Sequence, residues 1–133
     1  MSAIPGDHAC PCGSGLDFAR CCEPYLDGAP APTPEALMRS RYTAFARGDE
    51  DHIFRTWHPR TRPEGPYVDP GVAWTGLVVQ GSGLVGPVGD SGWVRYIASW
   101  MNADGRTGRV RELANFKKRG TRWYYLDGRD LDE

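Results

Sequence analysis

The sequence has no marked excess of charge of either sign, no long apolar run and no cysteine after residue 22. Sixteen basic residues nearly cancel seventeen acidic ones, which gives no general reason to expect nucleic acid as a partner. The apolar runs are far too short to span a bilayer, so we expect no membrane insertion. An apolar fraction of 40% excludes a disordered chain.

The N-terminal residues lack both the basic stretch and the apolar stretch of a secretory signal. We therefore expect a cytoplasmic protein. In that compartment thiols stay reduced, and clustered cysteines are metal ligands more readily than disulfide partners.

The four cysteines lie close together in the sequence, with the spacing C-x-C-x8-C-C: Cys10, Cys12, Cys21 and Cys22. Four thiolates can close a tetrahedral shell around Zn²⁺. A proline and two glycines supply the tight turn that the first pair needs. The adjacent second pair is poorly shaped for an internal disulfide, which leaves two disulfides between the pairs as the alternative in a secreted protein.

These cysteines predict one structural Zn²⁺ ion. A closed shell of four thiolates has no open position for water, so we expect the ion to fold this segment and not to catalyse a reaction. Residues 1–30 carry one arginine against four acidic side chains. With the charge of about −2 on a zinc tetrathiolate, the segment becomes an acidic cap.

Two stretches resemble known families. The run CPCGSG at 10–15, followed by CC at 21–22, resembles the SEC-C motif, the zinc module at the end of the SecA translocation motor. The runs PEALMRSRYTAF at 34–45 and TWHP at 56–59 are similar to the YchJ-like family. This resemblance covers nearly the whole chain and implies a SEC-C motif followed by a domain of the nuclear transport factor 2-like fold.

The SEC-C resemblance implies protein contacts, because in SecA the motif contacts the chaperone SecB and the ribosome. The YchJ-like resemblance implies no assigned activity. This chain departs from longer relatives, which end in a second SEC-C motif. Its residues 16–20, LDFAR, also replace the usual lysine-rich loop. We therefore do not expect an electrostatic grip on ribosomal RNA.

The sequence divides into a zinc knuckle at 1–27 and a nuclear transport factor 2-like domain at 28–133. Residues 28–34, at the start of the second part, form a proline-rich linker.

Two helices are expected after the linker. Thr33 as N-cap, followed by proline and glutamate, predicts the start of a helix that ends at Gly48. Asp49 caps a second helix, whose apolar residues include Trp57 and which Pro59 stops.

Alternating apolar residues predict four strands, at 72–79, 93–101, 110–116 and 123–126. The turn at 102–105 joins the second strand to the third. Helices followed by strands define an α+β fold. The resemblance sharpens this to a cone-shaped (cystatin-like) domain with helices packed on a curved antiparallel sheet.

A glycine pattern at 81–86 matches the dinucleotide-binding fingerprint G-x-G-x-x-G. That mechanism needs a helix directly afterwards to hold the pyrophosphate, and residues 87–92 form a turn sequence instead. We interpret the glycines as a mobile loop between strands.

The candidate polar residues of the cone are His58 and Glu112, for acid/base chemistry, and Arg41, Tyr42 and Trp57, for ligand binding. Histidine moves protons near neutral pH, although a histidine beside a helix end commonly only caps the helix. A carboxylate among apolar strand residues needs a partner, for which we expect an arginine, Arg39 or Arg41. No catalytic residue is assigned.

The sequence therefore favours a non-catalytic protein-interaction module, a zinc knuckle displayed on a scaffold, linked by resemblance to secretion or translation machinery. The alternative is a small-molecule binder or an acid/base enzyme that uses the cone cavity. We expect a monomer or a homodimer. Fold alone does not decide between these functions.

Overall fold

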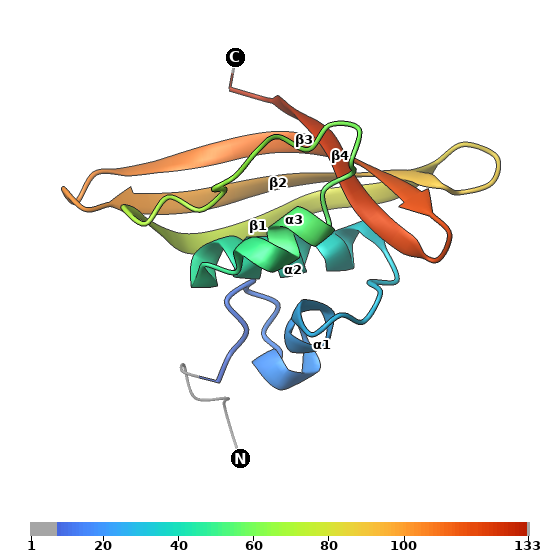
Figure 1. Cartoon of the computed structure of the whole chain (residues 1–133). Helices are drawn as coiled ribbons and strands as arrows, with labels where there is room; N and C mark the ends of the chain where they lie inside the picture. Colours follow the sequence, from blue (N-terminus) through green and yellow to red (C-terminus); the bar gives the residue numbers. More distant parts are fainter. Residues whose placement is uncertain (1–7, 133) are drawn as a thin grey trace.

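The structure is a computed structural model that describes residues 8–132 (Figure 1). Its helical segments come first: η1 (Phe18–Arg20), α1 (Glu23–Leu26), α2 (Pro34–Arg47) and α3 (Glu50–Arg55). The strands follow: β1 (Val72–Val85), β2 (Ser91–Asn102), β3 (Thr107–Arg119) and β4 (Arg122–Asp130). The α+β architecture is confirmed. Residues 1–7 of the predicted knuckle, and residue 133, lie outside the described residues.

The longest helix, α2, begins and ends where its capping residues predict. The Thr33 hydroxyl accepts a hydrogen bond from the Ala36 N–H at 3.0 Å, and Pro34 occupies the first turn. At the other end Gly48 has a φ of 79°, the left-handed conformation that terminates many helices. In the part of the chain that is described, no helix is both long and apolar enough to cross a membrane.

Helix α3 starts at its predicted cap but is shorter than the sequence predicts. Asp49 accepts a hydrogen bond from the His52 N–H at 3.0 Å. The helix ends at Arg55 because the chain then pairs with β4. The Tyr125 N–H donates to the Thr56 carbonyl at 2.8 Å, and the His58 N–H donates to the Tyr125 carbonyl at 2.7 Å. Trp57 and His58 therefore follow α3 and are not part of it.

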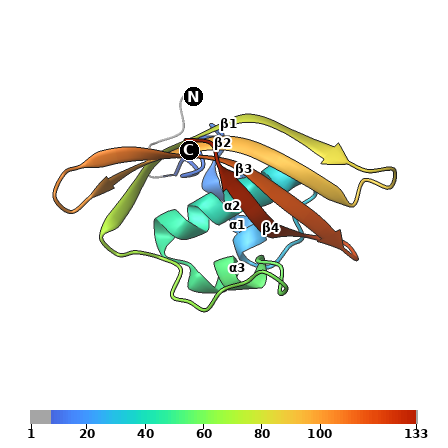
Figure 2. The same ribbon diagram turned by 90° about the horizontal axis from the view of Figure 1, so that it is seen from above.

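The four strands form one antiparallel sheet in the order β1-β2-β3-β4. The predicted turn at 102–105 is confirmed: the Gly105 N–H donates to the Asn102 carbonyl, and the Asn102 side chain accepts from two further backbone N–H groups. Register shifts interrupt β1 twice and the β3–β4 pairing once. Such bulges increase the local bend and twist of a sheet. In Figure 2 the sheet curves around α2, and α3 lies farther from the strands.

Strand β1 continues through the glycine pattern at 81–86, as far as Val85, where the sequence suggests a mobile loop. Gly81 and Gly83 pair with Arg95 and Trp93 of β2. A Cβ atom on Gly83 would lie 2.9 Å from the Trp93 indole nitrogen. The glycines therefore make room for a tryptophan on the neighbouring strand. The sequence of the glycine segment alone does not show this pairing.

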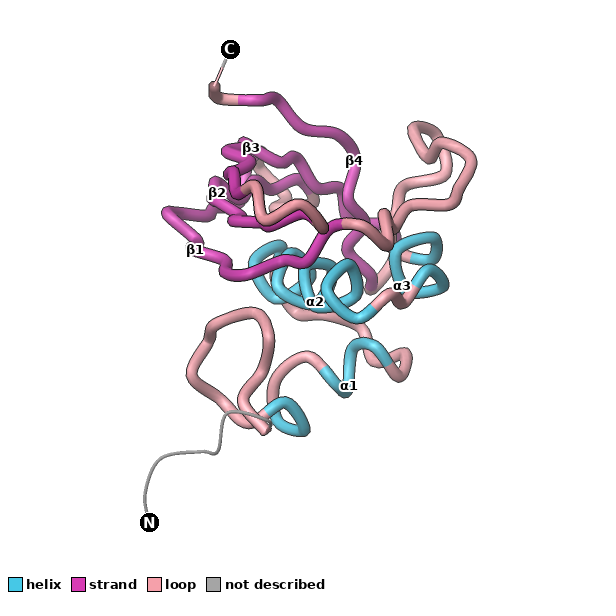
Figure 3. Tube along the Cα trace, turned by 90° about the vertical axis from the view of Figure 1, so that its left-hand side faces the viewer, coloured by secondary structure: helices cyan, strands magenta, loops and turns pink. Residues whose placement is uncertain are grey.

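Three layers make up the described part of the chain. Helix α2 lies between the sheet and the N-terminal loops that carry the cysteines (Figure 3). We call residues 8–27 the knuckle. The core between α2 and the sheet includes the buried side chains Leu37, Val94, Ala114, Phe116 and Trp123.

Candidate metal centre and cone cavity

The sulfur atoms of the four cysteines lie within 4.8 Å of one another. The Sγ–Sγ distance is 3.6 Å between Cys12 and Cys21 and 4.0 Å between Cys21 and Cys22. A regular tetrahedron with Zn–S bonds of about 2.3 Å has edges of about 3.8 Å. The sulfurs are therefore spaced as ligands of one ion, and the cluster could hold a metal.

All four cysteines are free thiols in the structure. A disulfide needs an S–S distance of about 2.05 Å. The two measured distances are well beyond that length, so the disulfide alternative does not describe this arrangement.

The turn between the two cysteine pairs brings the sulfurs together. The Gly13 N–H donates to the Cys10 carbonyl at 3.2 Å, and Gly13 has a φ of 78°, which other residues adopt at a cost. Ser14 Oγ lies 3.2 Å from Cys21 Sγ and accepts a hydrogen bond from the Leu16 N–H. The predicted glycine turn therefore also supplies a hydroxyl contact to the cluster.

The thiols of the cluster have opposite tendencies to ionise. Hydrogen bonds from Cys10 and Cys22 lower the pKa of Cys12, so one thiolate is favoured. Burial raises the pKa of Cys21 to about 11, and hydrogen bonding to Cys10 and Cys12 raises that of Cys22. Several thiolates at these distances repel one another, and a bound cation removes that repulsion.

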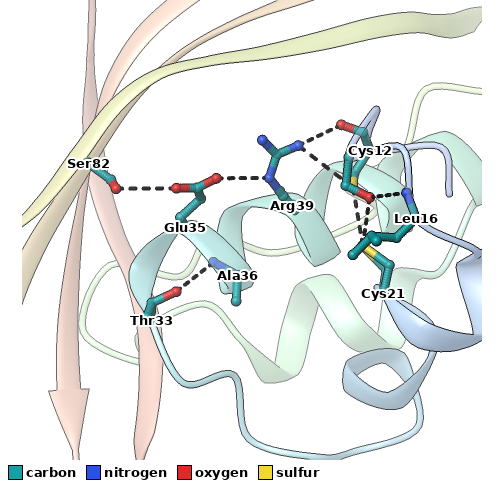
Figure 4. Close-up of polar contacts among 10 residues, drawn as sticks. Cys12, Leu16, Cys21, Thr33, Glu35, Ala36, Arg39 and Ser82 are labelled. Carbon is teal, nitrogen blue, oxygen red and sulfur yellow. Dashed lines mark hydrogen bonds and ion pairs between the residues drawn. The ribbon is translucent and has the colours of Figure 1, made fainter.

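Helix α2 contributes two polar side chains to the cluster. Arg39 Nη1 donates to the Cys12 carbonyl at 3.0 Å and to Cys12 Sγ at 3.8 Å (Figure 4). One turn later, the Thr43 hydroxyl donates to Cys22 Sγ at 3.3 Å and lies 3.8 Å from Cys10 Sγ. Groups that hydrogen-bond to metal ligands orient them and adjust their charge.

The same arginine links the cluster to the sheet. Arg39 Nε donates to Glu35 at 3.0 Å, and Glu35 accepts from the Ser82 hydroxyl of β1 at 3.4 Å (Figure 4). Although burial opposes it, hydrogen bonding to Glu35 and Cys12 raises the pKa of Arg39. Arg39 was expected from the sequence as a partner of Glu112, and Thr43 was not expected at any site. The sequence does contain one sign of this role: Arg39 and Thr43 are polar residues four positions apart, on the first long helix after the cysteines.

A small cavity of about 160 Å³ lies on the concave side of the sheet. Its lining is Met38, Arg41, Phe45, Trp57, Tyr96, Glu112 and Tyr125. The structure thus brings together Arg41, Trp57 and Glu112, three of the five candidate residues.

Arg41 is almost completely buried in this cavity. Its Nη1 donates to the Ile53 carbonyl at 3.1 Å and to the Thr56 hydroxyl at 2.7 Å. Its guanidinium carbon lies 5.0 Å from the ring centre of Trp57 and 4.6 Å from that of Tyr125. Burial lowers the pKa of Arg41 to about 10, so the side chain remains charged at neutral pH.

Two tyrosines hold Glu112 by hydrogen bonds, and Arg41, one of the two arginines expected as its partner, lies in the same cavity and interacts with its charge. The hydroxyls of Tyr96 and Tyr125 donate to its two oxygens at 2.5 and 2.9 Å. Tyr96 is directly opposite Glu112 in the β2–β3 register. Burial raises the pKa of both phenols, which keeps them protonated as donors. The tyrosines thus supply the hydrogen bonds to Glu112 and Arg41 supplies the opposite charge, whereas Arg39 pairs with Glu35 instead.

His58 and Tyr42 are not among the residues that line the cavity. His58 Nδ1 accepts from the Arg60 N–H at 3.1 Å, and its ring lies 6.2 Å from that of Tyr124. Partial desolvation and nearby Arg119 lower its pKa. Tyr42 is 4% exposed and packs edge-on against Trp74 of β1. Neither residue joins Glu112 in one site.

Comparison with known proteins matches both parts of the chain. Residues 9–24 match the SEC-C motif, and residues 33–128 match the family described as YchJ, middle NTF2-like domain. The fold and the cysteine cluster thus define a SEC-C motif protein with an NTF2-like domain. The chain belongs to the YchJ-like family, and similar members carry the name UPF0225 protein.

Relatives and solved structures resemble the chain over most of its length. A UPF0225 protein of Streptomyces coelicolor is 43% identical over 124 residues, which cover 92% of this chain and 96% of the relative. One from Deinococcus radiodurans is 45% identical over 119 residues, covering 89% and 86%. The solution structure of RPA3114, a SEC-C motif containing protein from Rhodopseudomonas palustris, has a TM-score of 0.80 and 34% identity, covering 93% and 99%. A SEC-C motif containing protein from Psychrobacter arcticus has a TM-score of 0.72 and 27% identity, covering 94% and 82%.

Proposed function

We propose that Cys10, Cys12, Cys21 and Cys22 bind one structural Zn²⁺ ion. The single observation that carries this is the spacing of four sulfurs within 4.8 Å of one another, three of them on buried residues. An all-thiolate tetrahedral set suits zinc, and a closed set has no position for a substrate. The ion would therefore hold the knuckle in shape.

Metal content tests this part directly. We expect elemental analysis of the purified protein to give one zinc per chain. Replacement by Co²⁺ should give the absorption of tetrahedral cobalt thiolate. The variant C22S should lose both signals. A metal content near zero in freshly purified, reduced protein would contradict the proposal.

We further propose that the protein is a non-catalytic interaction module in the cytoplasm that binds a partner protein through the knuckle. A groove of about 260 Å³ lies between the knuckle and α2, and its lining includes Leu16, Arg20, Tyr25, Glu35 and Arg39. Leu16 is 52% exposed at its edge. Apolar side chains that lie together in a groove rimmed by charged groups are typical of a protein-binding surface. The SEC-C resemblance favours secretion or translation machinery as the source of the partner.

A surface variant that still binds the metal tests whether the loss of partner binding is separate from unfolding of the knuckle. L16D should retain one zinc and lose the same co-purifying partners as the double variant C21S/C22S. V88D is the matched control, because Val88 is 77% exposed in the turn between β1 and β2. Retention of every partner by both L16D and C21S/C22S would sink this part of the proposal.

Small-ligand binding in the cone cavity is the second candidate. The observation that favours it is that the charged side chains of Arg41 and Glu112 line one cavity. The volume of about 160 Å³ is small beside the roughly 300–1,000 Å³ of typical ligand pockets. The separation of His58 from Glu112 gives acid/base catalysis no support. We therefore rank this function below the interaction module.

A further inference from the structure

One face of the sheet is turned away from α2, and no helix of residues 8–132 covers it. In Figures 1 and 3 the helices and the knuckle all lie on the opposite side of the strands. Side chains alternate along a strand, so the neighbours of the buried residues Val94, Ala98 and Ala114 point away from α2. We call this side of the sheet the outer face. Its central residues on β2 and β3 are Trp93, Arg95, Ile97, Arg111, Leu113 and Asn115.

The charges on the outer face are mostly positive. The strand alternation and register place five basic side chains on it: Arg95, Arg109, Arg111, Lys117 and Arg129. Among the residues of the four strands, Asp127 is the acidic side chain on this face, opposite Asn115. The outer face is therefore positive although the whole chain has a net charge of −1. Net charge conceals this pattern because acidic side chains elsewhere in the chain cancel it.

Three of these five side chains are available to an external anion. The other two pair with Asp90 and Asp132, at 3.4 and 3.3 Å. Arg95, Arg109 and Arg129 are exposed and make no hydrogen bond or ion pair with any residue from 8 to 132. Unpaired cations grouped on one surface attract a partner that carries several negative charges.

Beside Arg95 the outer face presents an indole ring. Trp93 lies over Gly81 and Gly83, because Cβ atoms at these two positions would be 3.4 and 2.9 Å from its ring. Neither glycine has a side chain that could cover the indole. The ring and the arginine line a groove of about 430 Å³, together with Gln80, Leu113 and Asn115. This volume is within the range of small-molecule sites.

Charge and shape together select the occupant of this face. A second copy of the chain would bring the arginines of two outer faces together, and like charges repel. An acidic protein segment would match the arginines, but its carboxylates make no use of the indole. A single-stranded nucleic acid matches both features, because its phosphates are anionic and its unpaired bases stack on aromatic side chains. In a duplex the bases stack on one another and are not available to Trp93.

We propose that the outer face of the sheet binds single-stranded nucleic acid. One base stacks on Trp93 in the groove, and backbone phosphates lie against Arg95 and Arg129. These two arginines flank Leu113 in one row across the sheet, about 10 Å apart, so they contact separate phosphates. The site lies on the other side of α2 from the knuckle and does not depend on the interaction function proposed above.

NMR titration of the full-length protein tests the proposal. At low salt, a ten-nucleotide oligouridylate should shift the assigned indole N–H signal of Trp93 in a saturable way. Trp123, which is 4% exposed in the core, is the internal control, and its indole signal should not move. A ten-residue oligoglutamate and a ten-base-pair RNA duplex should each bind at least about tenfold more weakly, because neither offers a base to stack on the indole. The proposal is overturned if oligouridylate gives no saturable shift, or if oligoglutamate or the duplex binds equally well.

Variants of the outer face complete the test, with the fluorescence anisotropy of labelled oligouridylate as the measurement. W93A should weaken binding about tenfold, which equals about 1.4 kcal/mol and is typical of one stacked base. R95Q and R129Q should each make the slope of log binding constant against log salt concentration less steep by about 0.7, the value for one phosphate contact in a single strand.

R47Q is the matched control, because it removes the same charge from the end of α2, on the other side of the sheet. Dispersed amide signals of β2 and β3 show that each variant is folded. Salt slopes in R95Q and R129Q that equal the slope in R47Q would contradict the proposal, and so would unchanged affinity in folded W93A.

Discussion

The knuckle and the sheet bury different kinds of side chain. Within residues 8–27 the buried residues are Cys10, Cys12 and Cys22. The sheet instead buries apolar groups such as Val94 and Phe116. The helical segments of the knuckle are three and four residues long, whereas the strands of the sheet have between nine and fourteen.

The two regions therefore depend on different forces. Burial of apolar area stabilises the sheet and its packing on α2 without any added group. The knuckle buries few apolar side chains to offset the conformational entropy of its chain, so in our proposal the bonds of a metal ion supply the missing stabilisation. Helix α2 belongs to both regions, because one side packs on the sheet and Arg39 and Thr43 reach the cysteines.

Removal of the metal should have the largest effect, because it should unfold the knuckle and leave the sheet folded. Apparent binding free energies of structural zinc in small peptides are about 10–16 kcal/mol, so a strong chelator should unfold residues 8–27. Amide NMR signals of the knuckle should collapse to the unfolded range, while those of β2 and β3 stay dispersed. Loss of the sheet signals at the same chelator concentration would show that the scaffold also depends on the metal.

The substitution F116A should destabilise the sheet and leave the metal site of the knuckle intact. Phe116 is 1% exposed between the sheet and α2, and removal of such a side chain costs about 3–5 kcal/mol. We expect denaturant unfolding to show this loss of stability, with one metal ion still bound to the folded protein under native conditions. L84A, at a side chain that is 61% exposed, is the control and should change stability little. A loss of metal from folded F116A would contradict the separation.

The smallest expected effect is a loss of metal affinity when the contacts of α2 with the cysteines are removed. R39Q and T43V remove hydrogen bonds to the cysteines and should weaken metal binding about 10–100-fold, the usual range for partners of metal ligands. Competition with a chromophoric chelator measures this change. R106Q, at an exposed site in the turn between β2 and β3, is the matched control. Unchanged affinity in both R39Q and T43V would mean that α2 only supports the knuckle sterically.

Local signals predicted the helices well and the strands in part. Thr33, Asp49 and Gly48 mark helix ends through their own side-chain or backbone preferences, and these ends are confirmed. The end of α3 was missed because pairing of the following residues with β4 decides it. Strand β1 was predicted too short, because glycines are typical of loops. The reason for glycine in this strand is the tryptophan on the neighbouring strand, which is known only from the pairing.

The cysteine cluster could be predicted because its four cysteines lie within thirteen consecutive residues, and short chain segments keep them near one another. The cone cavity was predicted less well. Its residues come from α2, the segment after α3, and three strands. Glu112 lies opposite Tyr96 because of the β2–β3 register, which no single stretch of sequence specifies.

Local sequence was enough to predict the cysteine cluster, the helix caps and the α+β order of elements. Each of these depends on residues close together in the chain, where spacing and backbone preference are sufficient. The groups around the cysteines and around Glu112 could be identified only from the folded structure: Arg39 and Thr43 contact the cysteines, and two tyrosines contact Glu112. These contacts could not be predicted from local sequence because side chains distant in sequence meet only after the sheet register and the helix packing have formed.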